Sequence, residues 1–342
     1  MAEISRAPAK IGTVMRPTRL APGVPSPLLT PEPLDLDILQ EMYRGGAANL
    51  AGIDPRLNAT RIAKQLRVGR ARVAARLKSW SDSGFLQKYD VWLNPALFGW
   101  DGAWVAIRVT HPRVKPELFD RLALIDGVVS GIEFLGDWIS VGFVTPDARA
   151  LERTLGVVRG LAGVAGHEPP SMWTLPPPRR QLTRLDVRVV RALRERPRAT
   201  LSETARRVGI STRTMTRRYS ELLEDWAVWF VPVFDFRVVT GPVVSISLVL
   251  DGTASRESVS RQIRGRYPLT LEFQNSEVGP PIGRDEHVLV VLPPSAAHLE
   301  ELDRFVASLP GVSGQELSVM VRSRSFPEWF NRHLDTMAAR SA

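Results

Sequence analysis

The chain has 342 residues and a formal net charge of +9, so it should form roughly two to four domains and could bind an acidic polymer. Its 44% hydrophobic and 24% charged residues are typical of a soluble globular protein. The absence of cysteine excludes disulfides, thiolate metal sites and cysteine catalysis. No apolar run reaches the roughly 18 residues of a membrane span, and no hydrophobic signal core begins the chain, so we expect a cytoplasmic protein.

Residues 1–33 are rich in proline and basic residues and have no periodic apolar positions. This composition predicts a disordered basic arm, which could lie along an acidic polymer such as DNA or simply be solvated.

Residues 34–98 have the pattern of a winged helix-turn-helix, a DNA-binding motif. A packed helix begins at residue 34, a loop covers 45–56, and Asn58 can cap a second helix. After a tight break comes a basic helix whose apolar side is formed by Val73, Leu77 and Trp80. Gly84 ends this helix, and residues 85–93 alternate like a half-buried strand. Helix, turn, basic helix and strand follow one another in the order of the motif.

Residues 99–175 predict a second kind of domain, in which strands alternate with helices. The order βαββαβ is that of a ferredoxin-like split unit. We expect strands at 103–109, 128–134, 139–144 and 165–173, and helices at 115–125 and 147–161.

The chain then repeats itself after a stiff, proline-rich linker at 176–182. Residues 185–190 repeat residues 34–39 at a shift of 151 (185 − 34), and residues 204–208 repeat the second helix at a shift of 142 (205 − 63). The second copy is expected as a winged helix-turn-helix at 183–238 and a ferredoxin-like domain at 239–325, followed by a C-terminal tail at 326–342. The expected fold is therefore α+β, two tandem copies of a winged helix-turn-helix domain followed by a ferredoxin-like βαββαβ domain.

Both copies resemble the Lrp/AsnC (leucine-responsive/asparagine-regulator) family of transcriptional regulators. The strand GFLQKYDVWLNP at residues 84–95 is the most specific part of the resemblance, and residues 135–138 look like the family's Gly-Asp-aromatic turn. The second copy is looser, because its longer connection at 277–286 lacks this turn. The resemblance implies double-stranded DNA as partner, and a βαββαβ domain that senses an effector and oligomerises.

Each basic helix would then be a recognition helix. At about 100° per residue, Val73 facing inward places Ala71 and Ala75 outward, and Met215 facing inward places Arg213 and Arg217 in the same outward positions. Arginine can grip guanine or phosphate with two hydrogen bonds, so the first copy should mainly contact phosphates and the second should read bases. The expected DNA-binding residues are Arg70, Arg72, Arg76, Lys78, Lys88, Thr212, Arg213, Thr214, Arg217 and Arg218.

An effector such as an amino acid is expected at Gly136, Asp137 and Trp138. The glycine allows close approach, the carboxylate could accept an amino group, and the indole could wall an apolar side chain. A simple β-turn with Trp138 in the core is the alternative interpretation. Because one chain owns two units of each kind, we expect an intrachain pseudo-dimer, which could assemble further into a homo-oligomer.

An enzymatic function is the competing hypothesis, since siroheme decarboxylases also resemble tandem Lrp-like halves. Such an enzyme should carry histidines and arginines in a strand of the βαββαβ unit, but residues 128–134 and 269–274 contain neither. None of the five histidines has a metal-ligand spacing. We therefore expect no catalytic residues, metal or cofactor. A ligand-binding protein that has lost DNA contact is disfavoured by the basic recognition helices.

Overall fold

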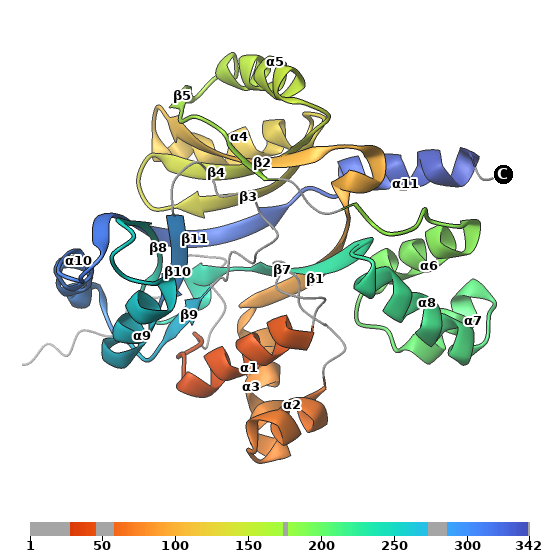
Figure 1. Ribbon diagram of the computed structural model, residues 1–342, viewed down its shortest axis with the longest axis horizontal. Coiled ribbons are helices and arrows are strands. Elements are labelled where there is room, and N and C mark those ends of the chain that lie inside the picture. The colour runs from red at the N-terminus through yellow and green to blue at the C-terminus, as the bar shows by residue number, and fades with distance from the viewer. Residues whose placement is uncertain (1–27, 46–57, 174–176, 273–285, 341–342) are drawn as a thin grey trace, which may run out of the picture.

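The computed structural model describes residues 28–45, 58–173, 177–272 and 286–340, and it shows an α+β structure in which one kind of unit occurs twice (Figure 1). None of the described helices is long and apolar enough to cross a membrane.

The first helix-turn-helix consists of α1 (Pro33–Gly45), α2 (Ala59–Leu66) and α3 (Arg70–Ser83), followed by strand β1 (Leu86–Leu93). The Asn58 side chain caps α2 by accepting a hydrogen bond from the Arg61 amide at 3.0 Å. Gly84 ends α3 with a φ of 76°, a left-handed conformation that glycine adopts without strain. Val73 and Trp80 are fully buried on the inner side of α3. These local predictions are confirmed.

The second helix-turn-helix consists of α6 (Arg184–Glu195), α7 (Leu201–Val208) and α8 (Thr212–Glu224), followed by β7 (Val228–Phe234). Thr183 with Asp186, and Thr200 with Glu203, form capping boxes that begin α6 and α7. As predicted, the buried side of α8 carries Met215, Tyr219 and Leu222.

A βαββαβ unit follows each helix-turn-helix, and its four main strands take the ferredoxin-like spatial order 4-1-3-2. The first unit comprises β2 (Asp101–Val109), α4 (Lys115–Leu122), β3 (Val128–Phe134), β4 (Trp138–Thr145), α5 (Ala148–Arg159), β5 (Val164–His167) and β6 (Ser171–Trp173). The second comprises β8 (Val243–Leu250), α9 (Arg256–Arg266), β9 (Thr270–Glu272), β10 (Glu286–Val291), α10 (Leu299–Ala307) and β11 (Val312–Ser325). The strand expected at 165–173 is broken into β5 and β6 because Pro169 and Pro170 cannot donate to the ladder.

The two wing strands pair with each other instead of each forming a separate wing. β1 and β7 are antiparallel, with Asp90 opposite Val231. Asn94 and Asp235 cap the short 3-10 helices η1 (Pro95–Phe98) and η3 (Phe236–Val238) in the same way. Equivalent residues of the two wings are therefore 141 positions apart in the sequence (235 − 94). Asp90 and Val231 differ by the same 141 (231 − 90), so a pseudo-twofold axis relating the two wings passes through this pair.

The two βαββαβ sheets are fused by β11. Its first part pairs with β8, and residues 320–325 continue past that sheet to pair with β3. Within the described residues this makes one sheet of nine strands, which runs through the middle of the molecule in Figure 1. The pseudo-dimer therefore shares backbone hydrogen bonds at both the wings and the sheets.

The helix-turn-helix units are crossed with respect to the sheets, which differs from the arrangement expected from the chain order. Ile38 and Trp80 of the first copy share a core with Val243 and Val290 of the second copy's sheet. Val189 and Leu193 of α6 share a core with Val129 and Val144 of the first copy's sheet. Each helix-turn-helix is thus held between its own wing and the βαββαβ unit of the other copy.

The segment expected as a C-terminal tail forms helix α11 (Glu328–Arg340), which packs on α6. Trp329, Phe330 and Leu334 are buried in the core of the second helix-turn-helix. The apolar side chains at i, i+1 and i+5 form the stripe that this packing requires.

The end of the expected basic arm is also packed. Leu29 is 4% exposed, and its amide donates to the Val238 carbonyl at 2.7 Å. Residues 1–27 of the arm, and the loop residues 46–57, lie outside the described residues.

Phe330→Ala should lower the free energy of unfolding by about 3–5 kcal/mol, because it opens a cavity beside Trp92 in a fully buried site. Thr336→Ala, at an exposed position of the same helix, should change it by no more than about 0.5 kcal/mol. Urea unfolding followed by circular dichroism measures both. Equal effects of the two substitutions would mean that α11 is not docked in solution.

Candidate nucleic-acid interface

The outward side of α3 carries Arg70, Ala71, Arg72, Ala75 and Lys78, all exposed as the helix geometry predicts. Among the described residues, Arg72 has only a long contact to Glu32, at 3.8 Å, and its side chain is 65% exposed. Lys78 forms an ion pair with Asp82 one turn along the helix. Such exposed pairs contribute little, so both cations remain available to a polyanion.

The outward side of α8 is richer in hydrogen-bond donors. Thr212, Arg213, Thr216 and Arg217 are exposed, whereas Thr214 is partly buried at the capped start of the helix. Arg217 is 63% exposed and has a 3.7 Å contact to Glu221. Thr216 was not among the expected contacts, although its position one residue past the inward Met215 could have indicated its exposure. α8 can therefore present two guanidinium groups and two hydroxyls to the same partner.

Arg76 faces inward and is not available to DNA, contrary to the prediction. Its Nε donates to Asp35 Oδ1 at 2.8 Å, and its Nη1 donates to Glu32 at 3.0 Å. Trp80 Nε1 also donates to Asp35 Oδ1, at 2.8 Å. Because Asp35 lies on α1, this cluster ties the recognition helix to the first helix. The expected flank of α3 is turned toward α1 by these contacts.

Arg218 occupies the corresponding position in the second copy and is likewise turned inward. It lies 3.6 Å from Asp186 of α6 and is 20% exposed. Arg180, from the proline-rich linker, also binds Asp186 at 2.8 Å and Asp225 at 2.9 Å, so the linker is fixed to this helix-turn-helix. Leu222 stands where the first copy has Trp80 (222 − 80 = 142), and Asp186 Oδ1 has no hydrogen bond among the described residues. The second copy has replaced the indole donor with a linker arginine.

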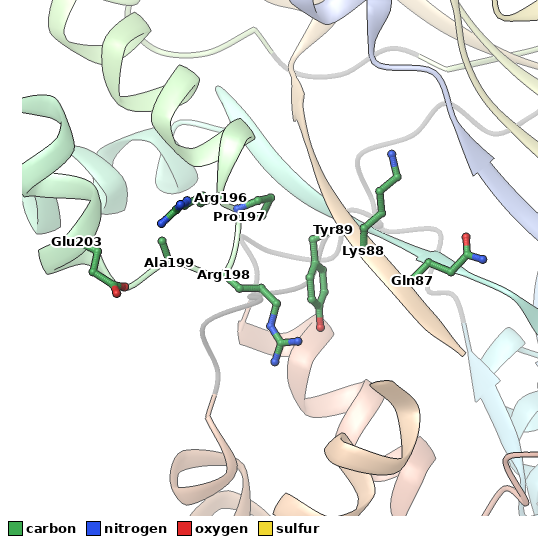
Figure 2. Close-up of a pocket in the computed structure, with 8 residues that line it drawn as sticks. All are labelled: Gln87, Lys88, Tyr89, Arg196, Pro197, Arg198, Ala199 and Glu203. Atoms are coloured by element: carbon green, nitrogen blue, oxygen red, sulfur yellow. The ribbon is translucent and has the colours of Figure 1, made fainter. Parts of the chain in front are cut away.

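Lys88 lies on β1, next to an open cavity formed with the α6–α7 turn of the second copy (Figure 2). Its ammonium group pairs with Asp90 at 3.1 Å, and the Lys88 side chain is 50% exposed. In Figure 2 the Lys88 side chain points away from Tyr89 and Arg198, as alternation along a strand requires. Lys88 is thus placed between the two copies and not at the tip of a wing.

The expected effector turn joins β3 to β4. Gly136 has a φ of 86°, a conformation that favours glycine. Asp137 is 48% exposed and lies 3.5 Å from Arg108, whose guanidinium stacks over Trp138 at 4.7 Å. Trp138 is partly buried, so it is neither free nor a core residue. An amino group binding Asp137 would have to displace Arg108.

Lys115 of α4 binds the same β3–β4 hairpin through its side chain. It is 1% exposed, and its Nζ donates to the Phe134 carbonyl at 2.5 Å. Burial lowers the pKa of this lysine, against the opposing effect of Glu133 and Asp137. The hydrogen bond from buried Lys115 to the Phe134 carbonyl fixes the turn, and the periodicity of the sequence did not indicate it.

Arginines also gather where the two copies meet, at the β3–β11 junction. Arg322 binds Glu133 at 2.6 Å, Arg324 binds Asp120 at 3.4 Å, and Arg237 binds Asp235 at 2.6 Å. Residues 128–134 gave no sign of these arginines, because Arg322 and Arg324 reach β3 from strand β11 of the other copy and Arg237 lies on η3. No group of three or more His, Cys, Asp or Glu residues able to hold a metal occurs within the described ranges.

The family model for winged helix-turn-helix DNA-binding domains matches residues 182–225, which cover α6, α7 and α8. No curated protein sequence matches the chain significantly.

Several solved structures are similar in fold. The siroheme decarboxylase NirDL is 15% identical, with a TM-score of 0.48 over 90% of this chain and 99% of that chain. AsnC of E. coli is 18% identical, with a TM-score of 0.30 over 44% of this chain and 97% of that chain. The leucine response regulatory protein LrpA of Mycobacterium tuberculosis is 23% identical, with a TM-score of 0.29 over 42% and 91%. Likenesses this remote do not assign a function.

Asp186→Asn should destabilise the second helix-turn-helix at neutral pH. Burial opposes ionisation of Asp186, but the Thr183 hydroxyl and amide and the Arg180 guanidinium outweigh it and lower its pKa. The carboxylate therefore stabilises the fold fully above its ordinary pKa of about 3.9, and this contribution is lost as pH falls through the lower folded pKa. We expect a loss of about 1.5–3 kcal/mol at pH 7.

Urea unfolding at neutral pH and below the ordinary carboxyl pKa would measure this difference. The difference in free energy of unfolding between the wild type and Asp186→Asn should become smaller at the acidic pH. Asp82→Asn, at a position 54% exposed in the first copy, should show no such gap. A gap that is independent of pH would contradict an ionised Asp186.

Proposed function

We propose that the chain is a sequence-specific, duplex DNA-binding transcriptional regulator with two recognition helices in one polypeptide. The observation that carries the proposal is the outward side of α8, where Arg213 and Arg217 stand with Thr212 and Thr216 while the apolar side is buried. Two planar guanidinium groups spaced one helical turn apart suit bidentate contacts in a major groove. The family model matched at 182–225 supports the same use of this segment.

Charge supports the proposal in both copies. Arg70 at the start of α3 and Arg213 on α8 have no ion pair with any carboxylate among the described residues. The formal net charge of +9 favours association with a polyanion, through release of counterions.

The two recognition helices are not equivalent. Ala71 and Ala75 occupy the positions that Arg213 and Arg217 occupy in the second copy (213 − 71 = 142; 217 − 75 = 142). Alanine can approach the DNA closely and touch a thymine methyl, whereas arginine discriminates guanine by hydrogen bonds. The proposed operator is therefore an imperfect repeat, with the half-site under α8 read more stringently.

An amino-acid effector at the β3–β4 turn is part of the proposal. Asp137 would accept the amino group and Trp138 would contact the side chain, once Arg108 is displaced. This exchange would couple ligand binding to β2, which carries Arg108 at its C-terminal end.

Arg213→Ala and Arg217→Ala should each weaken binding to selected DNA by about 1–3 kcal/mol and relax base preference in one half-site only. Arg261→Ala removes the same charge from an exposed position of α9, which belongs to the second βαββαβ unit and to neither helix-turn-helix, and should change neither. Binding of each variant to libraries randomised one half-site at a time measures both effects. Unchanged preference in both α8 variants would exclude α8 as a reading helix.

A siroheme decarboxylase is the second candidate function. The observation that favours it is the gathering of Arg237, Arg322 and Arg324 at the junction of the copies, because arginines bind the carboxylates of a tetrapyrrole well. Each of these arginines already has a carboxylate partner, so a substrate would have to displace Asp235, Glu133 or Asp120.

Titration with iron–uroporphyrin III separates the two candidates. Under the DNA-binding proposal we expect no saturable change in its visible absorption. A stoichiometric change that is weakened in Arg324→Gln, and unaffected in Arg261→Gln, would favour the enzyme.

A further inference from the structure

The cavity in Figure 2 is built jointly by the two copies. It has a volume of about 390 Å³ and lies between β1 of the first copy and the α6–α7 turn of the second. Tyr89 contributes from β1, Arg196 and Arg198 from the turn, and Glu203 from α7. The cavity is open to solvent along one side.

The cationic side chains that line the cavity outnumber its one carboxylate, Glu203. Neither Arg196 nor Arg198 forms an ion pair with a carboxylate of the described residues, and Arg198 lies over the Tyr89 ring at 5.8 Å. By contrast, nearby Arg194 is satisfied by Asn331 at 2.7 Å, and Arg207 by Glu195. Glu203 keeps its negative charge: its carboxylate accepts hydrogen bonds from the Thr200 amide and hydroxyl, both at 2.8 Å, and attracts the Arg196 guanidinium electrostatically. Against this one carboxylate, the cavity is lined by the cations of Lys88, Arg196 and Arg198. The cavity therefore favours an anion.

The cavity also lies beside the pseudo-twofold axis. Tyr89 is adjacent in the chain to Asp90, through which the axis passes. When a twofold arrangement of recognition helices binds DNA, the dyad of the operator coincides with that of the protein. Phosphates near the operator centre are then the ones closest to this axis.

We propose that Arg196 and Arg198 bind a backbone phosphate of DNA near the centre of the operator, between the two half-sites. This inference rests on the proposed DNA-binding function. Small ligands bind in concave sites that enclose most of their surface, and this open cavity does not do so. A phosphate that belongs to a polymer needs no enclosure, because other contacts hold the polymer. Such a contact positions the protein and carries no sequence information.

The contact is on one side of the operator only. Phe230 occupies the position of Tyr89 in the second copy (230 − 89 = 141) and is 1% exposed. The first-copy segment corresponding to the α6–α7 turn falls at 46–57, outside the described residues, and its sequence contains a single basic residue, Arg56. The central phosphates of the two strands should therefore be contacted unequally.

The test compares the full-length wild type with Arg196→Gln/Arg198→Gln on a labelled random-sequence duplex several helical turns long. Each phosphate contact contributes about 0.9 to the slope of log affinity against log salt, so the double variant should lower that slope by about 1–2. The matched control is Arg261→Gln/Arg304→Gln, two arginines that are each 72% exposed on α9 and α10, which should leave the slope unchanged. Arg196→Lys/Arg198→Lys keeps both positive charges and should retain most of the wild-type slope. This variant shows that a reduced slope in the glutamine variant comes from lost charge and not from misfolding.

Ethylation interference on duplexes selected by the wild type locates the contact. We expect interference at phosphates on one side of the centre, lost in the glutamine double variant. Failure of the wild type to bind any duplex at low salt would refute the proposed function. Wild-type binding with an equal slope and equal interference in the glutamine variant would refute this inference alone. Saturable binding of inorganic phosphate that is lost in that variant, with DNA binding unchanged, would assign the cavity to a free anion and overturn the assignment to DNA.

Discussion

The antiparallel pairing of β1 with β7 is the constraint on which the rest of the molecule depends. Pairing through Asp90 and Val231 fixes the pseudo-twofold axis and sets the two helix-turn-helix units on either side of it. In this ribbon, the chain that follows each wing continues on the other side of the pseudo-twofold axis. Each helix-turn-helix therefore packs on the sheet of the other copy. Backbone hydrogen bonds, which are independent of side-chain identity, allow this geometry to persist while the two copies diverge.

That divergence is visible in equivalent positions. In both copies an aspartate of the first helix holds an arginine of the third helix, Asp35 with Arg76 of α3 and Asp186 with Arg218 of α8. The first copy completes the cluster with Trp80, and the second with Arg180 from the linker. The buried sides of α3 and α8 are therefore kept in place by similar ion pairs, although their exposed sides are free to change. The two halves of a covalent pseudo-dimer need not be identical, because they are separate segments of one chain and can change independently.

Local periodicity was sufficient to predict most helices and strands, because caps such as Asn58 and terminators such as Gly84 act within a few residues. The apolar sides of α3 and α8 followed from the same rule. Contacts between distant segments could not be predicted this way. The inward turn of Arg76 depends on Asp35, 41 residues away, and the meeting of Arg322 with Glu133 spans 189 residues. Helix α11 was not predicted, because its apolar side chains are buried only by packing on α6, a contact between distant segments. The transcriptional role and the effector remain predictions.

The position of β11 in the chain has a consequence for biosynthesis. This strand and α11 are synthesised after both helix-turn-helix units, yet β11 covers the edge of β3, and α11 completes the core around α6. Until β11 has been synthesised, the β3 edge of the first copy's sheet is unpaired, and such edges readily recruit other strands. A nascent chain therefore cannot finish its first half before its second half exists, although amino-terminal domains ordinarily fold first. Chaperone protection of the incomplete chain, and intolerance of premature termination, are the expected costs of joining two copies in this crossed manner.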